Sequence, residues 1–154
     1  MKKLSLITVS LLLTACANNL PVKSETLTVS ETLRVQYEKA WQKTLQVLKS
    51  QGFSIDSSNK TGGVISIGET FVKLNERQAD CGNYHGISFL KDYRTSTSVT
   101  LFIDLEKISG NATAIRVNSS LKASFNTGIG SDTTYMPCYS SGDLEKRLIA
   151  SIKE

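Results

Sequence analysis

Two stretches of the chain carry apolar residues at helical spacing. Between residues 30 and 52 the apolar side chains recur every three or four positions, which predicts a helix with one apolar face. Its apolar positions are Leu33, Tyr37, Trp41, Leu45 and Leu48. Ser30 or Thr32 would cap its start, and Gly52 stands where a left-handed residue would end it.

The second helical pattern lies at the C-terminus, in residues 140–154. Leu144, Leu148, Ile149 and Ile152 fall on one side of it, and a Ser/Asp start precedes them. A closing helix is therefore expected there.

Between these two stretches, apolar and polar residues alternate as they do in strands with one buried face. Val99, Leu101, Ile103 and Leu105 share one side of the clearest run, residues 97–108. After a Ser-Gly-Asn turn at 109–111, residues 112–125 return with the same alternation, which predicts a long antiparallel hairpin with one face in water. Further strands are expected at residues 25–30, 53–55, from 64 onward and at 87–93.

The resulting order is β-α-β-β-β-β-β-α. Strands grouped before a closing helix predict an α+β fold, in which an antiparallel sheet packs against a long helix in the N-terminal half and a C-terminal helix. No Pro/Gly/Ser-rich linker and no internal repeat divides residues 26–154, which are expected to form a single domain.

The N-terminus has the organisation of an export signal. Lys2 and Lys3 precede an apolar run over residues 4–13, which is too short to span a bilayer. The following Leu-Thr-Ala-Cys resembles the bacterial lipobox. The resemblance implies that residues 1–15 are a lipoprotein signal peptide and that Cys16 is acylated as the first residue of the mature chain. Residues 16–25 would then be a lipidated tether.

The residue after Cys16 is Ala17 rather than Asp, which by the rule of that family implies an outer-membrane lipoprotein that faces the periplasm, with the membrane as a partner through its lipid. Three acyl chains on Cys16 would give stable anchoring.

Two cysteines remain once Cys16 is assigned to the lipid. Cys81 and Cys138 would lie in a compartment that permits disulfides, and we expect them to pair. Asp80 and His85 lie close to Cys81 in the sequence, so a metal site or a reactive thiol stays open as an alternative.

Charge and motifs argue against two other classes of function. Without the signal peptide the chain has 16 basic and 14 acidic side chains and no basic run, so no nucleic-acid partner is expected. His85 is the only histidine, no G-x-S-x-G elbow is present, and no glycine-rich segment leads from a strand into a helix. We therefore expect no enzymatic activity, no cofactor and no metal.

Residues 37–67 resemble the helix-grip domain of the BamC lipoproteins, which are accessories of outer-membrane β-barrel assembly. The shared features are a tryptophan early in a helix, a Gly-Phe-x-Ile-Asp exit and a Gly-Gly pair before a strand. In this sequence they are Trp41, Gly52, Phe53, Ile55, Asp56, Gly62 and Gly63. The resemblance implies a helix-grip fold, an envelope location and a non-catalytic accessory role.

Tyrosine and methionine residues gather around the two remaining cysteines. Tyr84 and His85 follow Cys81, while Tyr135, Met136 and Tyr139 surround Cys138. Tyr and Met are enriched at protein–protein interfaces, so these five residues are the predicted partner-binding set. The expected function is a structural or assembly adaptor that contacts an envelope protein. The alternative is a binder of a lipid or small apolar ligand in the groove between sheet and helix.

Overall fold

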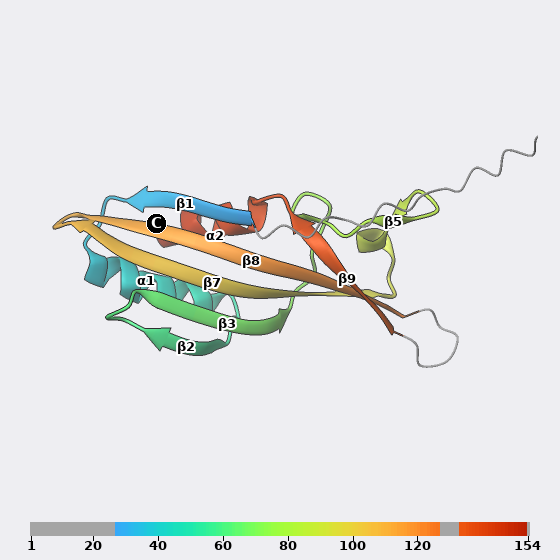
Figure 1. The fold of residues 1–154 in the computed structure, drawn as a ribbon, viewed down its shortest axis with the longest axis horizontal. Helices are drawn as coiled ribbons and strands as arrows, with labels where there is room; N and C mark the ends of the chain where they lie inside the picture. The colour runs from blue at the N-terminus through green and yellow to red at the C-terminus, as the bar shows by residue number, and fades with distance from the viewer. Residues whose placement is uncertain (1–26, 127–132, 154) are drawn as a thin grey trace, which may run out of the picture.

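The computed structural model describes residues 27–126 and 133–153, which make a sheet with two helices on one face (Figure 1). Cys16, the signal peptide and the tether lie outside the described residues. In chain order the elements are β1 (Leu27–Leu33), α1 (Tyr37–Ser50), β2 (Ile55–Asn59), β3 (Val64–Phe71), β4 (Ala79–Asp80), β5 (Asn83–Tyr84), β6 (Ile87–Ser88), the 3₁₀ turn η1 (Phe89–Lys91), β7 (Thr95–Ser109), β8 (Ala112–Asn126), β9 (Thr133–Ser140) and α2 (Asp143–Lys153).

The centre of the sheet is the hairpin of β7 and β8, each of 15 residues. Its register runs from Thr95 opposite Phe125 to Ser109 opposite Ala112, so the predicted hairpin and its turn are confirmed. The buried positions alternate along both strands, because one face packs on the core and the other meets water.

The other strands extend this hairpin on both sides. β3 pairs with β7, and β2 pairs with β3, all antiparallel. Two strands pair with the edge of β8 that faces away from β7. β1 pairs with residues 113–119, and β9 pairs with residues 121–126. β4 adds a short pairing to β9, and β5 with β6 forms a separate two-stranded hairpin.

The first helix is shorter than the sequence pattern predicts, and it starts later. The chain stays extended through Leu33, which pairs with Thr113 of β8 and is buried there, so the expected cap at Ser30 or Thr32 is wrong. Pairing with β8 overrides the helical periodicity because it buries Leu33 and satisfies the backbone at the same time. The predicted end is correct: Gly52 has a φ of +81° and follows the helix.

The expected fold class, an α+β helix-grip arrangement around a long N-terminal-half helix, is therefore wrong. Strands account for 53% of the described residues, and the two helices have 14 and 11 residues. Two other predictions fail locally. The strand expected at 87–93 is only the two residues of β6 followed by η1, and the loop expected before Ser140 contains the strand β9.

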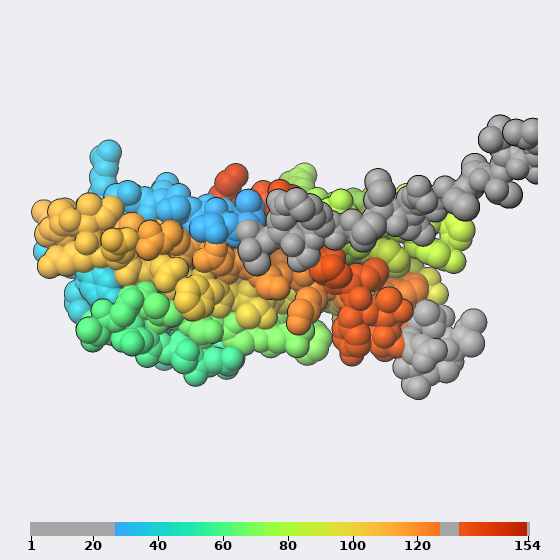
Figure 2. Space-filling model, viewed as in Figure 1, coloured from blue at the N-terminus to red at the C-terminus, as the bar shows by residue number. Residues whose placement is uncertain are grey.

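The core lies between the helices and the inner face of the sheet. Trp41 and Leu48 of α1 and Ile149 of α2 are almost fully buried against it. Neither of the two described helices lies on the opposite face of the sheet, and Figure 2 shows the strands of that face side by side at the surface. We call this the open face.

Candidate functional site

The long strands continue past both helices, as Figure 1 shows. We call this part the distal end: residues 95–97 of β7, 122–126 of β8 and 133–137 of β9. Its inner face is covered by the segment between β4 and β7. The ring of Phe89 meets that of Phe125 with centroids 5.4 Å apart, and the guanidinium of Arg94 lies 4.6 Å from the Phe125 ring centroid. Aromatic and cation–π contacts therefore hold this segment against the sheet.

A cysteine pair ties the same segment to β9. The Sγ atoms of Cys81 and Cys138 are 2.03 Å apart, at disulfide bond distance, and both residues are buried. Ala79 pairs with Ser140, and this register brings Cys81 opposite Cys138. The link therefore joins two residues that face each other across the ladder.

The alternative metal or thiol site does not form around these sulfur atoms. With both Sγ atoms in one bond, neither is a thiolate ligand. The Asp80 carboxylate instead accepts a hydrogen bond of 2.8 Å from the backbone N–H of Gly82. Within residues 27–126 and 133–153, no group of three or more His, Cys, Asp and Glu side chains is placed to hold a metal ion.

The five predicted partner-binding residues do not form one patch. The rings of Tyr84 and His85 touch, with centroids 4.2 Å apart, on the β5–β6 hairpin. Tyr135 and Tyr139 are exposed on the open face of β9. Met136 points the other way and packs against the core, because successive strand residues face opposite sides.

The open face at the distal end has aromatic residues on its two outer strands. Phe71 of β3 pairs with Ser98, Ser98 with Lys122, and Lys122 with Pro137 of β9. Residues paired across antiparallel strands share a face, so Phe71 and Tyr135, two residues from Pro137, lie on the same side of the sheet. Three strand spacings separate the outer strands, which amounts to about 14 Å.

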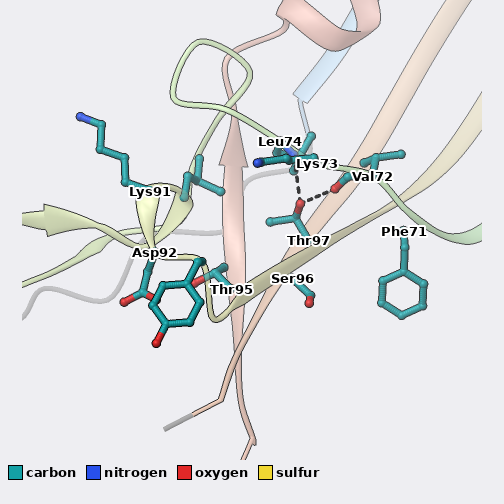
Figure 3. A pocket seen from close by; sticks show the side chains of 11 residues that line it. Phe71, Val72, Lys73, Leu74, Lys91, Asp92, Thr95, Ser96 and Thr97 are labelled. Atoms are coloured by element: carbon teal, nitrogen blue, oxygen red, sulfur yellow. Dashed lines mark hydrogen bonds between the residues drawn. The ribbon is translucent and has the colours of Figure 1, made fainter. Parts of the chain in front are cut away.

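A groove of about 580 Å³ opens along β7 where β3 leaves the sheet (Figure 3). The Oγ1 of Thr97 donates to the carbonyl of Val72 and accepts from the N–H of Leu74 at 3.0 Å, and these two bonds hold the chain beside β7 just after β3 ends. Phe71 and Tyr93 both line the groove, and their side chains are 76% and 95% exposed.

Two pairs of opposite charges lie beside the groove. Arg94 donates to the carboxylate of Asp92 at 2.7 Å, and this side-chain hydrogen bond lowers the pKa of Asp92 from its ordinary 3.8 to about 2. Lys91 forms an ion pair of 2.9 Å with Glu76. Lys73 also lines the groove and has no ion pair within residues 27–126 and 133–153, so this surface combines exposed aromatic rings with one cation.

Sequence reasoning missed Phe71 and Tyr93. Simple alternation places Phe71 on the side of Ile65 and Ile67, which are buried. A bulge between Ile67 and Thr70 shifts the register and turns Phe71 to the open face. Tyr93 lies after η1 rather than in the strand expected there. We call Phe71 and Tyr93, together with Tyr135 and the neighbouring Tyr139 on the open face of β9, the distal surface.

A buried carboxylate was also missed. Glu145 of α2 is fully buried, and its Oε1 accepts hydrogen bonds from the hydroxyls of Ser119 and, at 2.7 Å, Ser140. Glu145 precedes Leu148 by three residues and Ile149 by four, so helical spacing places it on the apolar side of α2. This spacing could have predicted from the sequence that Glu145 is buried.

Comparison with known proteins does not place the chain in a family. No family model matches it, and no curated protein matches it. A crystal structure of an uncharacterized protein from Bacillus thuringiensis aligns over 83% of this chain and 90% of that one, with 13% identity and a TM-score of 0.30. Neither helix in the described part of the chain is long and apolar enough to cross a membrane.

Proposed function

We propose that this protein is a lipid-anchored envelope protein that acts as a non-catalytic adaptor and binds a partner protein with its distal surface. The observation that carries the proposal is the position of the exposed aromatic side chains. Phe71 and Tyr93 line the groove, and Tyr135 and Tyr139 are exposed on the open face of β9. Phe71 and Tyr135 stand on opposite outer strands of the same face.

Exposed rings grouped in this way favour protein binding. Aromatic side chains bury a large area with few rotatable bonds, and they dominate the binding energy of many interfaces. Lys122, which is exposed between them on β8, would supply hydrogen bonds to such a partner. Phe71 belongs both to the groove and to the open face, so one partner could contact both.

The proposed address rests on the lipobox at Cys16, which implies anchoring in the outer membrane with the domain in the periplasm. The disulfide distance between Cys81 and Cys138 supports an exported protein, because such bonds persist in oxidising compartments.

The interior weighs against the alternative of an apolar ligand between sheet and helices. A binder of that kind needs a cavity, whereas Trp41, Leu48 and Ile149 pack there almost without exposed surface. The adaptor is therefore the function that the geometry supports best.

In-cell photocrosslinking of the tagged full-length protein, followed by mass spectrometry, tests the adaptor. We expect an envelope protein to crosslink to the wild type, and the crosslink to be lost in the triple variant Phe71→Ala, Tyr135→Ala, Tyr139→Ala. Ile108→Ala, which changes an exposed apolar residue on β7 next to its turn, is the matched control and should keep the crosslink. The same partner captured by the folded triple variant would contradict the proposed surface.

A further inference from the structure

The β5–β6 hairpin is a small two-faced projection at the distal end. Asn83 pairs with Ser88 and Tyr84 with Ile87, around a turn of His85 and Gly86. Both turn residues have positive φ, +51° and +79°, as a two-residue type I′ turn requires. Because paired residues share a face, Tyr84 and Ile87 form an apolar side, and the polar pair forms the other.

This apolar side is open to solvent. Tyr84 is 59% exposed and Ile87 is 62% exposed, at the end of a hairpin that lies off the main sheet. The turn also holds His85 in the left-handed region, which a residue with a side chain adopts at a cost. We call residues 83–88 the finger.

We propose that the finger lies in the headgroup region of the membrane to which Cys16 is anchored, so that the domain is held against the bilayer in one orientation. This inference rests on the lipid anchor of the proposed function. It assigns the apolar pair Tyr84 and Ile87 to a lipid surface rather than to the partner protein.

The length of chain outside the structure makes this contact possible. Eleven residue steps join Cys16 to Leu27, the first residue of β1, and they span at most about 40 Å. Leu27 pairs with Ser119 of β8. Along the same strand, Ser119 lies two residues, or about 7 Å, from Leu121, where the pairing with β9 ends. The start of β1 therefore lies close to the β9 end of the sheet.

The path from there to the finger is also short. Leu121 pairs with Cys138, which is linked to Cys81 at a Cα–Cα distance of 4.1 Å, and Tyr84 follows three residues later. The finger thus lies well within the reach of the tether. A lipid on Cys16 and the tip of the finger can meet the same membrane surface.

The chemistry of the finger suits the interface rather than the hydrocarbon interior. A tyrosine has an apolar ring and a hydroxyl that stays hydrated, and such side chains are enriched at the headgroup level. Beside the finger, Lys91 is paired with Glu76 and Arg94 with Asp92, so neither cation is free to attract an anionic headgroup. The carboxylate of Asp80 has no ion pair in the part of the chain that the structure describes and accepts from the backbone N–H of Gly82. We therefore expect the contact to be apolar and insensitive to salt.

Tryptophan reporters in the lipidated full-length protein test the inference. The protein is reconstituted into vesicles of phosphatidylethanolamine and phosphatidylglycerol, with or without brominated phosphatidylcholine, which quenches tryptophan on contact. Ile87→Trp is the reporter, and Ile108→Trp is the matched control, since Ile108 is 56% exposed at the opposite end of β7. The native Trp41 is buried in the core and is shielded in both variants.

We expect the bromine to quench the emission of Ile87→Trp and the vesicles to shift it to shorter wavelength, at low and high salt alike. Ile108→Trp should show only the emission change of the wild type. Tyr84→Trp is a second reporter on the same face and should behave as Ile87→Trp does.

The outcomes separate this inference from the function on which it rests. Mass spectrometry of the N-terminal peptide first shows whether Cys16 carries lipid; a chain without lipid overturns the proposed address and this inference together. Lipid on Cys16 with unquenched reporters at 84 and 87 overturns only the finger's contact with the membrane, and leaves its apolar face to a protein partner. Equal quenching of Ile87→Trp and the control Ile108→Trp would also overturn the proposed orientation.

Discussion

Glu145 occupies a position where α2 otherwise buries apolar side chains. A buried carboxylate is costly unless hydrogen bonds replace its water. Here the hydroxyls of Ser119 on β8 and Ser140 at the end of β9 both donate to Oε1, whereas Oε2 is buried with no hydrogen-bond partner among the described residues. The Oγ of Ser140 also accepts from the N–H of Gly142 at 3.1 Å. One carboxylate thus joins the start of α2 to two strands.

Removing this carboxylate should destabilise the fold. In Glu145→Ala the two serine hydroxyls lose their acceptor and a cavity forms, so the free energy of unfolding should fall by about 2–4 kcal/mol. Urea unfolding followed by circular dichroism measures it. Glu145→Gln keeps an oxygen acceptor and nearly the same volume, and it should cost less. Equal losses in the two variants would mean that these hydrogen bonds are not the cause.

At the scale of an element, the β2–β3 hairpin depends on a glycine. Gly63 has a φ of +74°, and its carbonyl accepts from the N–H of Leu105 at 2.7 Å, next to the start of β3. A Cβ at Gly63 would lie 2.0 Å from the carbonyl oxygen of Leu105. The turn therefore brings two backbones closer than any side chain allows.

Gly63→Ala should lower the free energy of unfolding by more than ~1 kcal/mol, because the new Cβ clashes with backbone and the φ is unfavourable. Gly110, in the turn of the β7–β8 hairpin, has nothing within 4 Å of its added Cβ, so Gly110→Ala is the control and should change stability little. Thermal unfolding of both variants provides the comparison. If Gly110→Ala lost as much stability as Gly63→Ala, the close approach of Gly63 to Leu105 would be excluded as the cause of the loss.

At the scale of the whole molecule, the distal end depends on covalent and aromatic contacts instead of on the helices. The chain between β4 and β7 contains only two-residue strands and one 3₁₀ turn. It is held by the link between Cys81 and Cys138 and by the contact of Phe89 with Phe125. This segment carries Tyr93 and the finger, so the proposed surfaces depend on it.

The double variant Cys81→Ala, Cys138→Ala should lose about 2–4 kcal/mol in free energy of unfolding, because the unfolded chain regains the freedom of a 57-residue loop. Amide hydrogen exchange should rise most in residues 79–94, whose backbone then has few other restraints. Unchanged exchange in that segment would show that the aromatic contacts suffice. Cys16→Ser leaves the pair intact and is the control.

Patterns that depend on neighbours along the chain were predictable from the sequence. The alternation around Leu101 and the turn at Gly110 determine the central hairpin, and the spacing of Leu148 and Ile149 determines α2, because each pattern expresses the period of its own backbone. The cysteine pair was also predictable, by assigning the third cysteine to the lipobox.

Only the tertiary structure decided where these elements meet. The sequence pattern places Leu33 in a helix, whereas in the structure it is extended, because pairing with the edge of β8 buries it. Simple alternation predicts that Phe71 is buried, whereas it is exposed, because a bulge turns its side chain to the other face of the sheet. Tyr135 and Met136 were predicted to belong to one partner-binding set, but their side chains face opposite ways, since β9 is a strand and not a loop. Local periodicity thus determined the central hairpin and the C-terminal helix, whereas strand pairing between distant segments determined which side chains form the candidate site.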